Sequence, residues 1–182
     1  MSSKPPKVGI QLGKINLKKF SAIALGIPQK NQKAKLPNSP LIKEIEKDFG
    51  INLASELKKW PDYVAKSGEI IEIPIATGNK GLIRIYLVGV GESKREDIRK
   101  AGISIARKVK GSGQQVALAV VENRLFIENF VTSLILASYV WNQKSPKKDE
   151  KGAAEFVFIE KGKEFTKEIK DRKSTRLNSS HT

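Results

Sequence analysis

Residues 82–110 read LIRIYLVGVGESKREDIRKAGISIARKVK, and this stretch decides the fold class. Its first nine residues are mostly β-branched or apolar, which predicts a strand. After Gly91, apolar side chains recur every three or four residues, which predicts one face of an amphipathic helix. These side chains are Ile98, Ala101, Gly102, Ile105, Ala106 and Val109. Ser93, with Glu96 three residues later, is expected to cap this helix.

The segments on either side continue the pattern. Residues 69–76 predict a strand, and residues 77–81 (TGNKG) have the chemistry of a hairpin turn. Beyond the helix, residues 115–121 predict a buried strand, residues 124–141 a second long helix, and residues 155–159 a last short strand. This alternation implies crossover connections, hence an α/β fold with a mostly parallel sheet.

The first half of the chain holds shorter elements. Residues 7–12 and 21–27 predict strands, and residues 30–40 predict a polar loop interrupted by proline. Ser39 is expected to cap a helix over residues 41–49, which the following glycine ends. Hairpin elements in this half are expected to add antiparallel strands, so that the sheet is mixed.

Composition limits the classes of protein to consider. The chain has 182 residues, of which 39% are hydrophobic, as expected for a globular protein with a proper core. The absence of cysteine excludes a disulfide framework and thiolate zinc sites. The longest uncharged stretch, residues 129–143, is too short to span a membrane, so no membrane partner is expected. No signal peptide is expected either, and we predict a cytoplasmic location.

The turn at residues 87–93 is the main candidate for a ligand loop. Gly89 and Gly91, with Ser93 at the expected helix start, resemble the beginning of a phosphate-binding loop. The GxGxxG pattern is incomplete, because residue 94 is lysine. The interpretation that we favour is a tight strand-to-helix turn that needs small residues. Among the carboxylates, Glu69 and Glu72 are expected on opposite faces of a strand, and Glu44, Glu46 and Asp48 on a surface helix among lysines, so a solvated face is favoured over acid–base chemistry and no catalytic residue is assigned.

A basic excess raises the question of nucleic acid binding. The chain carries 34 Lys and Arg against 19 Asp and Glu, a net charge of +15. The first 43 residues contain nine Lys and no acidic residue. However, 27 of the 34 basic residues are Lys, and aromatic residues are not interleaved with them. A solvated lysine-rich surface is therefore favoured, and nucleic acid is kept as a possible partner.

The end of the chain is treated separately. Residues 171–181 (DRKSTRLNSSH) are identical to the translation of a common short-read sequencing adapter. We therefore interpret residues 171–182 as a non-native tail and leave them out of the fold analysis. This tail holds the only histidine, so no histidine-dependent catalysis or metal site is expected. The reading frame of the gene is expected to continue past residue 170.

Three features of the second half resemble the N-terminal domain of the leucyl aminopeptidase (cytosol aminopeptidase) family. They are LVGVG at residues 87–91, RKAG at residues 99–102, and SLILASY at residues 133–139 with an aromatic residue beyond it. The structural positions that match are Ala101, Gly102, Leu136, Tyr139 and Trp141. Two positions depart from the family pattern, since Ser133 replaces a usual Gly and Trp141 a usual Phe.

This resemblance implies a three-layer α/β/α sandwich similar to macro domains over residues 1–160, followed at residues 161–170 by the start of a connecting helix. In the family, a separate catalytic domain hydrolyses peptides with two divalent metal ions, zinc or manganese, and the protein is a homo-oligomer, expected to be a hexamer. The catalytic signature NTDAEGRL is absent here, so no catalytic or metal residue is carried over. The chain is therefore expected to be inactive and structural, with its own catalytic domain and other copies as partners.

Two alternatives stay open at this point. A stand-alone macro-like binding module would hold a nucleotide or an ADP-ribose-type ligand at residues 89–93. A basic nucleic-acid-binding protein would instead use the lysine-rich surface, with an affinity that falls steeply with salt.

Overall fold

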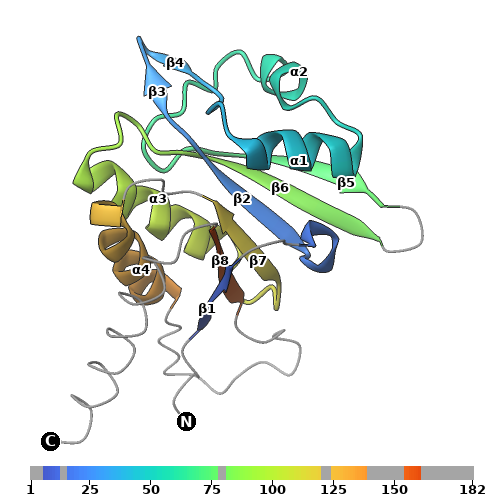
Figure 1. Cartoon of the computed structure of the whole chain (residues 1–182). Helices are drawn as coiled ribbons and strands as arrows, with labels where there is room; N and C mark the ends of the chain where they lie inside the picture. Colours follow the sequence, from blue (N-terminus) through green and yellow to red (C-terminus); the bar gives the residue numbers. More distant parts are fainter. Residues whose placement is uncertain (1–5, 13–15, 78–80, 120–123, 139–153, 161–182) are drawn as a thin grey trace, which may run out of the picture.

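A six-stranded sheet organises the chain, as the computed structural model in Figure 1 shows; residues 6–12, 16–77, 81–119, 124–138 and 154–160 are described. The strand order is β1-β8-β7-β2-β6-β5. The strands are β1 (Lys7–Leu12), β2 (Ala22–Ile27), β5 (Ile70–Ala76), β6 (Leu82–Gly89), β7 (Gln115–Ala119) and β8 (Glu155–Glu160). The expected α/β fold with a mixed, mostly parallel sheet is confirmed.

The antiparallel part of this sheet is smaller than expected. Only β5 runs antiparallel to its neighbour β6, whereas β1 pairs in parallel with β8, and β2 with both β6 and β7. The expectation that the first half contributes antiparallel strands thus holds for β5 and is wrong for β1 and β2. The reason is the connection after β2, which is long and helical and so makes a crossover instead of a tight turn.

Helices cover both faces of the sheet. They are η1 (Leu17–Lys19), α1 (Pro40–Phe49), α2 (Leu53–Lys58), α3 (Arg95–Lys108) and α4 (Arg124–Ser138). Figure 1 shows α3 and α4 on one face and α1 with α2 on the other. Each face has its own apolar core, and the buried side chains of β6 alternate between them, Val88 to α3 and α4 and Leu87 to α1 and α2. Because it is covered on both sides, the central strand β2 is buried throughout.

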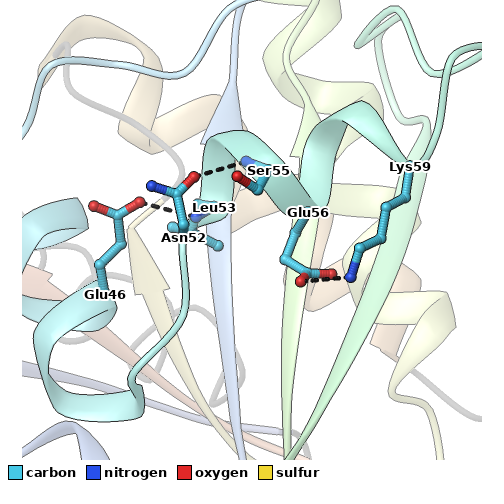
Figure 2. Close-up of polar contacts among 6 residues, drawn as sticks. All are labelled: Glu46, Asn52, Leu53, Ser55, Glu56 and Lys59. Carbon is cyan, nitrogen blue, oxygen red and sulfur yellow. Dashed lines mark hydrogen bonds and ion pairs between the residues drawn. The ribbon is translucent and has the colours of Figure 1, made fainter.

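Capping side chains set the ends of α1 and α2. Ser39 caps α1 as expected, accepting a hydrogen bond from the Leu41 N–H at 3.3 Å, and Gly50 ends it with φ at 63°. Figure 2 shows how α2 then begins: the Asn52 side chain accepts from Ser55 N–H at 2.7 Å. The Glu46 carboxylate also reaches from α1 to accept from the Leu53 N–H at 2.8 Å, so the two helices share one junction.

The predicted loop over residues 30–40 is wrong in its first half. It contains a short hairpin, β3 (Gln29–Lys30) with β4 (Lys33–Ala34). Asn31 and Gln32 form its turn, with φ at 51° and 58°. A two-residue hairpin turn of this kind needs positive φ at both central positions, and the usual signal is Asn-Gly. Gln at the second position hides that signal in the sequence.

The start of α3 lies one residue later than the predicted cap. Lys94 is the N-cap, and Asp97 accepts a hydrogen bond from the Lys94 N–H at 3.2 Å. The prediction that Ser93 and Glu96 form the cap is therefore wrong. Ser93 instead occupies the left-handed region with φ at 61°, as part of the turn that precedes the helix.

The two long helices touch through small residues. The predicted apolar face of α3 is buried, and at its centre Gly102 lies against α4. A Cβ added there would meet the Ser133 hydroxyl and would lie 2.7 Å from the Phe130 carbonyl oxygen. Ser133 donates to that same carbonyl at 2.9 Å. Ser133, which stands where the family pattern has Gly, thus lies at a close contact between α3 and α4.

The edge strand β5 contains a proline at a position where the missing N–H does not interrupt the pairing with β6. Hydrogen bonds from Gly89 N–H to Glu69 C=O and from Thr77 N–H to Gly81 C=O fix the alternation of the β5–β6 pair. Even-numbered residues of β5 therefore direct their backbone groups away from β6. Pro74 is one of them, so its missing N–H removes no bond between these strands.

Candidate functional site

The predicted ligand loop is a tight turn at the carboxyl end of β6. Gly89 is packed so closely that an added Cβ would collide with the Lys66 carbonyl oxygen and lie 2.7 Å from the Ala65 carbonyl carbon. Gly91 has φ at 55°, and Ser93 follows two residues later in the same turn. The structure therefore brings Gly89, Gly91 and Ser93 together, and it places the segment of residues 65–68 directly against them.

The backbone donors of this turn are used inside the fold. Gly89 N–H donates to Glu69 C=O at 2.7 Å, and Gly91 N–H donates to Ala65 C=O at 3.1 Å. Ser93 N–H donates to Val90 C=O at 2.9 Å. A phosphate held by backbone amides needs free N–H groups. A ligand at this turn would have to replace these bonds, so the geometry favours the tight-turn interpretation, and the ligand loop stays a prediction.

Charged side chains at the start of α3 also favour the tight-turn interpretation over a ligand loop. The Asp97 carboxylate accepts from Lys94 N–H and also from the Ser67 hydroxyl at 2.8 Å, which ties the segment of residues 65–68 to the helix. A carboxylate here stabilises the positive end of the helix dipole. The Lys94 ammonium pairs with the Glu92 carboxylate, whose hydrogen bond raises the pKa of Lys94. The carboxylates of Asp97 and Glu92 thus already supply negative charge at the place where an anionic ligand would bind.

Sequence reasoning missed a second polar cluster, which lies at the other end of α3. The Glu72 carboxylate on β5 pairs with Arg84 Nε at 2.9 Å and with Lys108 Nζ at 3.0 Å. The same ammonium lies 6.0 Å from the ring centre of Tyr86, whose hydroxyl donates to Gln114 at 3.3 Å. Burial raises the pKa of Tyr86. Because every charge here has a partner, the cluster joins β5, β6 and α3 and leaves no group poised for acid–base chemistry.

The carboxylates that were considered for catalysis have separate structural roles or lie at the surface. Glu69 accepts from the Lys66 N–H at 2.9 Å, and Glu72 belongs to the cluster just described. Glu46 caps α2, and Glu44 and Asp48 are half-exposed on α1. Within the described ranges, no three His, Cys, Asp or Glu side chains gather in a way that could hold a metal ion. These residues therefore do not fit the two-metal centre that the resemblance implies for the family.

A shallow groove of about 540 Å³ runs between the end of α2 and β5. Trp60, with 45% of its surface exposed, lines it together with Pro74 and Ile75. Its charged side chains are engaged, since Glu56 pairs with Lys59 at 2.7 Å and Glu72 with the cluster above. The groove therefore offers an apolar wall and no free reactive group among its described residues.

Comparison with known proteins settles the family. The sequence profile of the cytosol aminopeptidase family, N-terminal domain, matches residues 24–147. The chain belongs to this family. Among solved structures it is similar to a tomato leucine aminopeptidase mutant, K354E, with a TM-score of 0.62 and 24% sequence identity over 93% of this chain. At this level of sequence identity, the similarity shows a shared fold and nothing more. The match spans 36% of the tomato chain. No curated protein matches closely enough in sequence to be reported as a relative.

Membership of the cytosol aminopeptidase family gives the matching residues a context. Ala101 and Gly102 are buried on α3, and Gly102 lies against α4. Leu136 lies on α4 with 61% of its surface exposed. Tyr139 and Trp141 lie outside the described residues, as does the start of the connecting helix expected at residues 161–170. No helix in the described part of the chain is long and apolar enough to cross a bilayer.

Proposed function

We propose that this chain is the N-terminal, non-catalytic domain of a longer, metal-dependent leucyl aminopeptidase that removes N-terminal residues from peptides. The observation that carries the proposal is the match of residues 24–147 to that domain of the cytosol aminopeptidase family. The similarity to 36% of the tomato leucine aminopeptidase chain supports it. In this proposal the two divalent ions, zinc or manganese, belong to the catalytic domain that follows.

The domain's role in the parent enzyme is structural. It contacts its own catalytic domain and other copies of the protein, in a homo-oligomer that we expect to be a cytoplasmic hexamer. Helix α4 supports this role, because its sequence (RLFIENFVTSLILAS) carries only one basic and one acidic residue. A helix that is apolar on most sides usually has a partner on more than one side. The exposed Leu136 marks the side that the described residues leave open.

An activity assay tests the proposal that the domain itself is inactive. The chain is incubated with leucine para-nitroanilide in the presence of Zn²⁺ or Mn²⁺, and a chelator is added to matched samples. We expect no release of nitroaniline above the buffer rate in any sample. Release that the chelator abolishes would place a metal centre in this chain and contradict the proposal.

Sequencing of the source DNA across codon 170 tests the boundaries. We propose domain limits at residues 1–160, a connecting helix that starts at 161–170, and a non-native tail at 171–182. Reads that pass the junction should show the frame continuing into an acidic, metal-binding domain. A stop codon directly after codon 170 would instead favour the stand-alone binding module at Gly89, Gly91 and Ser93, which calorimetric titration with ADP-ribose would then examine.

A further inference from the structure

The outer edge of β5 is open to a further strand. The strand order ends at β5, and no other strand in the described part of the chain pairs with that edge. The alternation of the β5–β6 pair directs the backbone groups of every second residue outward, at Ile70, Glu72, Pro74 and Ala76. Pro74 contributes only its carbonyl. A row of outward N–H and C=O groups is a template on which an extended segment can pair.

The side chains on the two sides of this edge differ in chemistry. On the α2 side lies the groove described above, whose apolar wall includes Trp60 and Ile51. On the α3 side, the Glu72 carboxylate is shared between Arg84 Nε at 2.9 Å and Lys108 Nζ at 3.0 Å. Because two cations face one carboxylate, this group of three keeps an excess positive charge. All three side chains are partly exposed, at 31%, 35% and 42%, so the charge is accessible from outside.

Exposed apolar side chains gather beside the same edge. Among the described residues, three large hydrophobic side chains are exposed, and two of them, Trp60 and Leu82, lie here. Leu82 is directly opposite Ala76 in the β5–β6 pair, and Pro74 is exposed as well. Exposed apolar surface next to unpaired backbone groups is typical of a binding surface. The edge therefore combines main-chain hydrogen bonding, an apolar wall and a local positive charge.

We propose that the outer edge of β5 binds an extended acidic segment of another protein as an added strand. Successive side chains of a strand point to opposite faces, so the segment places apolar side chains against Trp60 and carboxylates towards Arg84 and Lys108. Main-chain hydrogen bonds to β5 supply affinity, and the alternating side chains supply specificity. The partner is thus defined by a pattern of alternating apolar and acidic residues, over a length similar to the seven residues of β5.

A second copy of this chain is a weaker fit to the same edge. Pairing of two β5 strands would lose the N–H of Pro74 in both, and proline on an edge strand disfavours such pairing. The net charge of +15 also makes two copies repel each other, whereas it attracts an acidic segment. This inference does not rest on the proposed aminopeptidase function, because it uses only β5 and the side chains beside it.

Labelled peptides of about eight residues test the pattern by fluorescence anisotropy. One alternates valine with glutamate, a second holds the same residues in scrambled order, and a third has lysine in place of glutamate. We expect the alternating acidic peptide to bind at least about tenfold more tightly than the scrambled one, which has the same charge, and the lysine peptide not to bind. Equal binding of the two acidic peptides would show that only bulk charge matters and would overturn the proposal. Binding of the lysine peptide, or no binding of the alternating acidic one, would overturn it as well.

Two N-methylated peptides test whether a strand is added. Both have the alternating valine–glutamate sequence, and the backbone nitrogen is methylated on every valine in one and on every glutamate in the other. In an added strand, the N–H groups of alternate residues point towards β5 and the others point away. We therefore expect one peptide to bind at least about tenfold more weakly than the unmodified sequence and the other to stay within about threefold of it. Equal effects in the two peptides would contradict strand addition.

Matched variants of the chain locate the binding surface. Trp60→Ala should weaken binding of the alternating acidic peptide at least about fivefold, and Lys108→Gln about threefold. The controls are Leu136→Ala, also an exposed apolar side chain, and Lys47→Gln, also an exposed lysine, and both should stay within about 1.5-fold of the unmodified chain. Circular dichroism checks that all four variants are folded. Losses in the controls equal to those in the β5-side variants, or no loss in either β5-side variant, would overturn the proposal.

Discussion

Replacement of Gly102 by Ala tests the packing between α3 and α4 most directly. In an isolated helix this change is favourable by about 1 kcal/mol, because Ala is the better helix former. Here the new methyl group would lie 2.7 Å from the Phe130 carbonyl oxygen and would also collide with the Ser133 hydroxyl. Real Cβ atoms essentially never come within 3.0 Å of another heavy atom, so one helix has to move.

The magnitude follows from these opposing contributions. Overpacking of a well-filled contact costs about 1–3 kcal/mol, and a clash with backbone belongs at the upper end because no rotamer change relieves it. Subtraction of the helix-propensity gain leaves a net loss of about 2 kcal/mol in the free energy of unfolding. For a domain of this size the melting temperature should fall by about 4–8 °C.

A double-mutant cycle with Ser133→Gly isolates the contact. The second change removes the hydroxyl and restores the residue that the family pattern has there, but it leaves the Phe130 carbonyl in place. We expect the pair to show a coupling energy of about 1 kcal/mol, a partial rescue. Gly9→Ala is the matched control, since its Cβ would meet nothing nearer than 3.9 Å, and its effect should stay within about 0.5 kcal/mol. Thermal and urea unfolding give the free energy of unfolding of Gly102→Ala, Ser133→Gly, the double variant and Gly9→Ala. A Gly102→Ala variant as stable as the parent would refute this account of the helix contact.

Three further predictions concern the turn, a buried tyrosine and the sheet edge. Gly89→Ala should lower unfolding free energy by about 3 kcal/mol or more, because its Cβ has no room beside Lys66; an unchanged urea midpoint would mean that the glycine serves a ligand only. Burial raises the pKa of Tyr63 above its ordinary value of 10.0, so its stabilisation is complete below pH 10 and lost as pH rises further; Tyr63→Phe should make this alkaline loss shallower, and identical pH profiles would contradict the reasoning. Pro74→Thr should change stability by no more than about 0.5 kcal/mol yet increase self-association measured by light scattering, since it restores an outward N–H on β5; a variant that stays as dispersed as the parent would show that the proline does not protect this edge.

Much of the fold could be predicted because burial and periodicity agree in its second half. The stretch from β6 to β7 has a strand, an apolar helix face and a buried strand in direct succession, and each of these local signals survives in the structure. The parallel pairing of β1 with β8, and of β2 with β6 and β7, could not be predicted from such local signals. Pairing partners of a strand depend on the whole chain, and β1 has its partner about 150 residues away.

The candidate turn shows a different limit of sequence reasoning. Glycines at Gly89 and Gly91 signal a need for close backbone approach, but the sequence does not say what approaches. The structure places the segment of residues 65–68 there, from a region without a clear periodic pattern. Asp97 was likewise hidden, because Glu96 stood at the spacing that the Ser93 cap required.

The order of strands also governs how the chain can be made. β8 lies between β1 and β7, so β1, which is synthesised first among the described strands, gains its neighbour only after β8, the last of them, has been made. Pairing across such a separation is slow, whereas β2, β5, β6 and β7 can assemble earlier from nearer parts of the chain. Until residue 160 is synthesised, β7 keeps an open edge and β1 remains unpaired, a state exposed to aggregation. A translational pause or cleavage before β8 would therefore be far more damaging than one shortly after it.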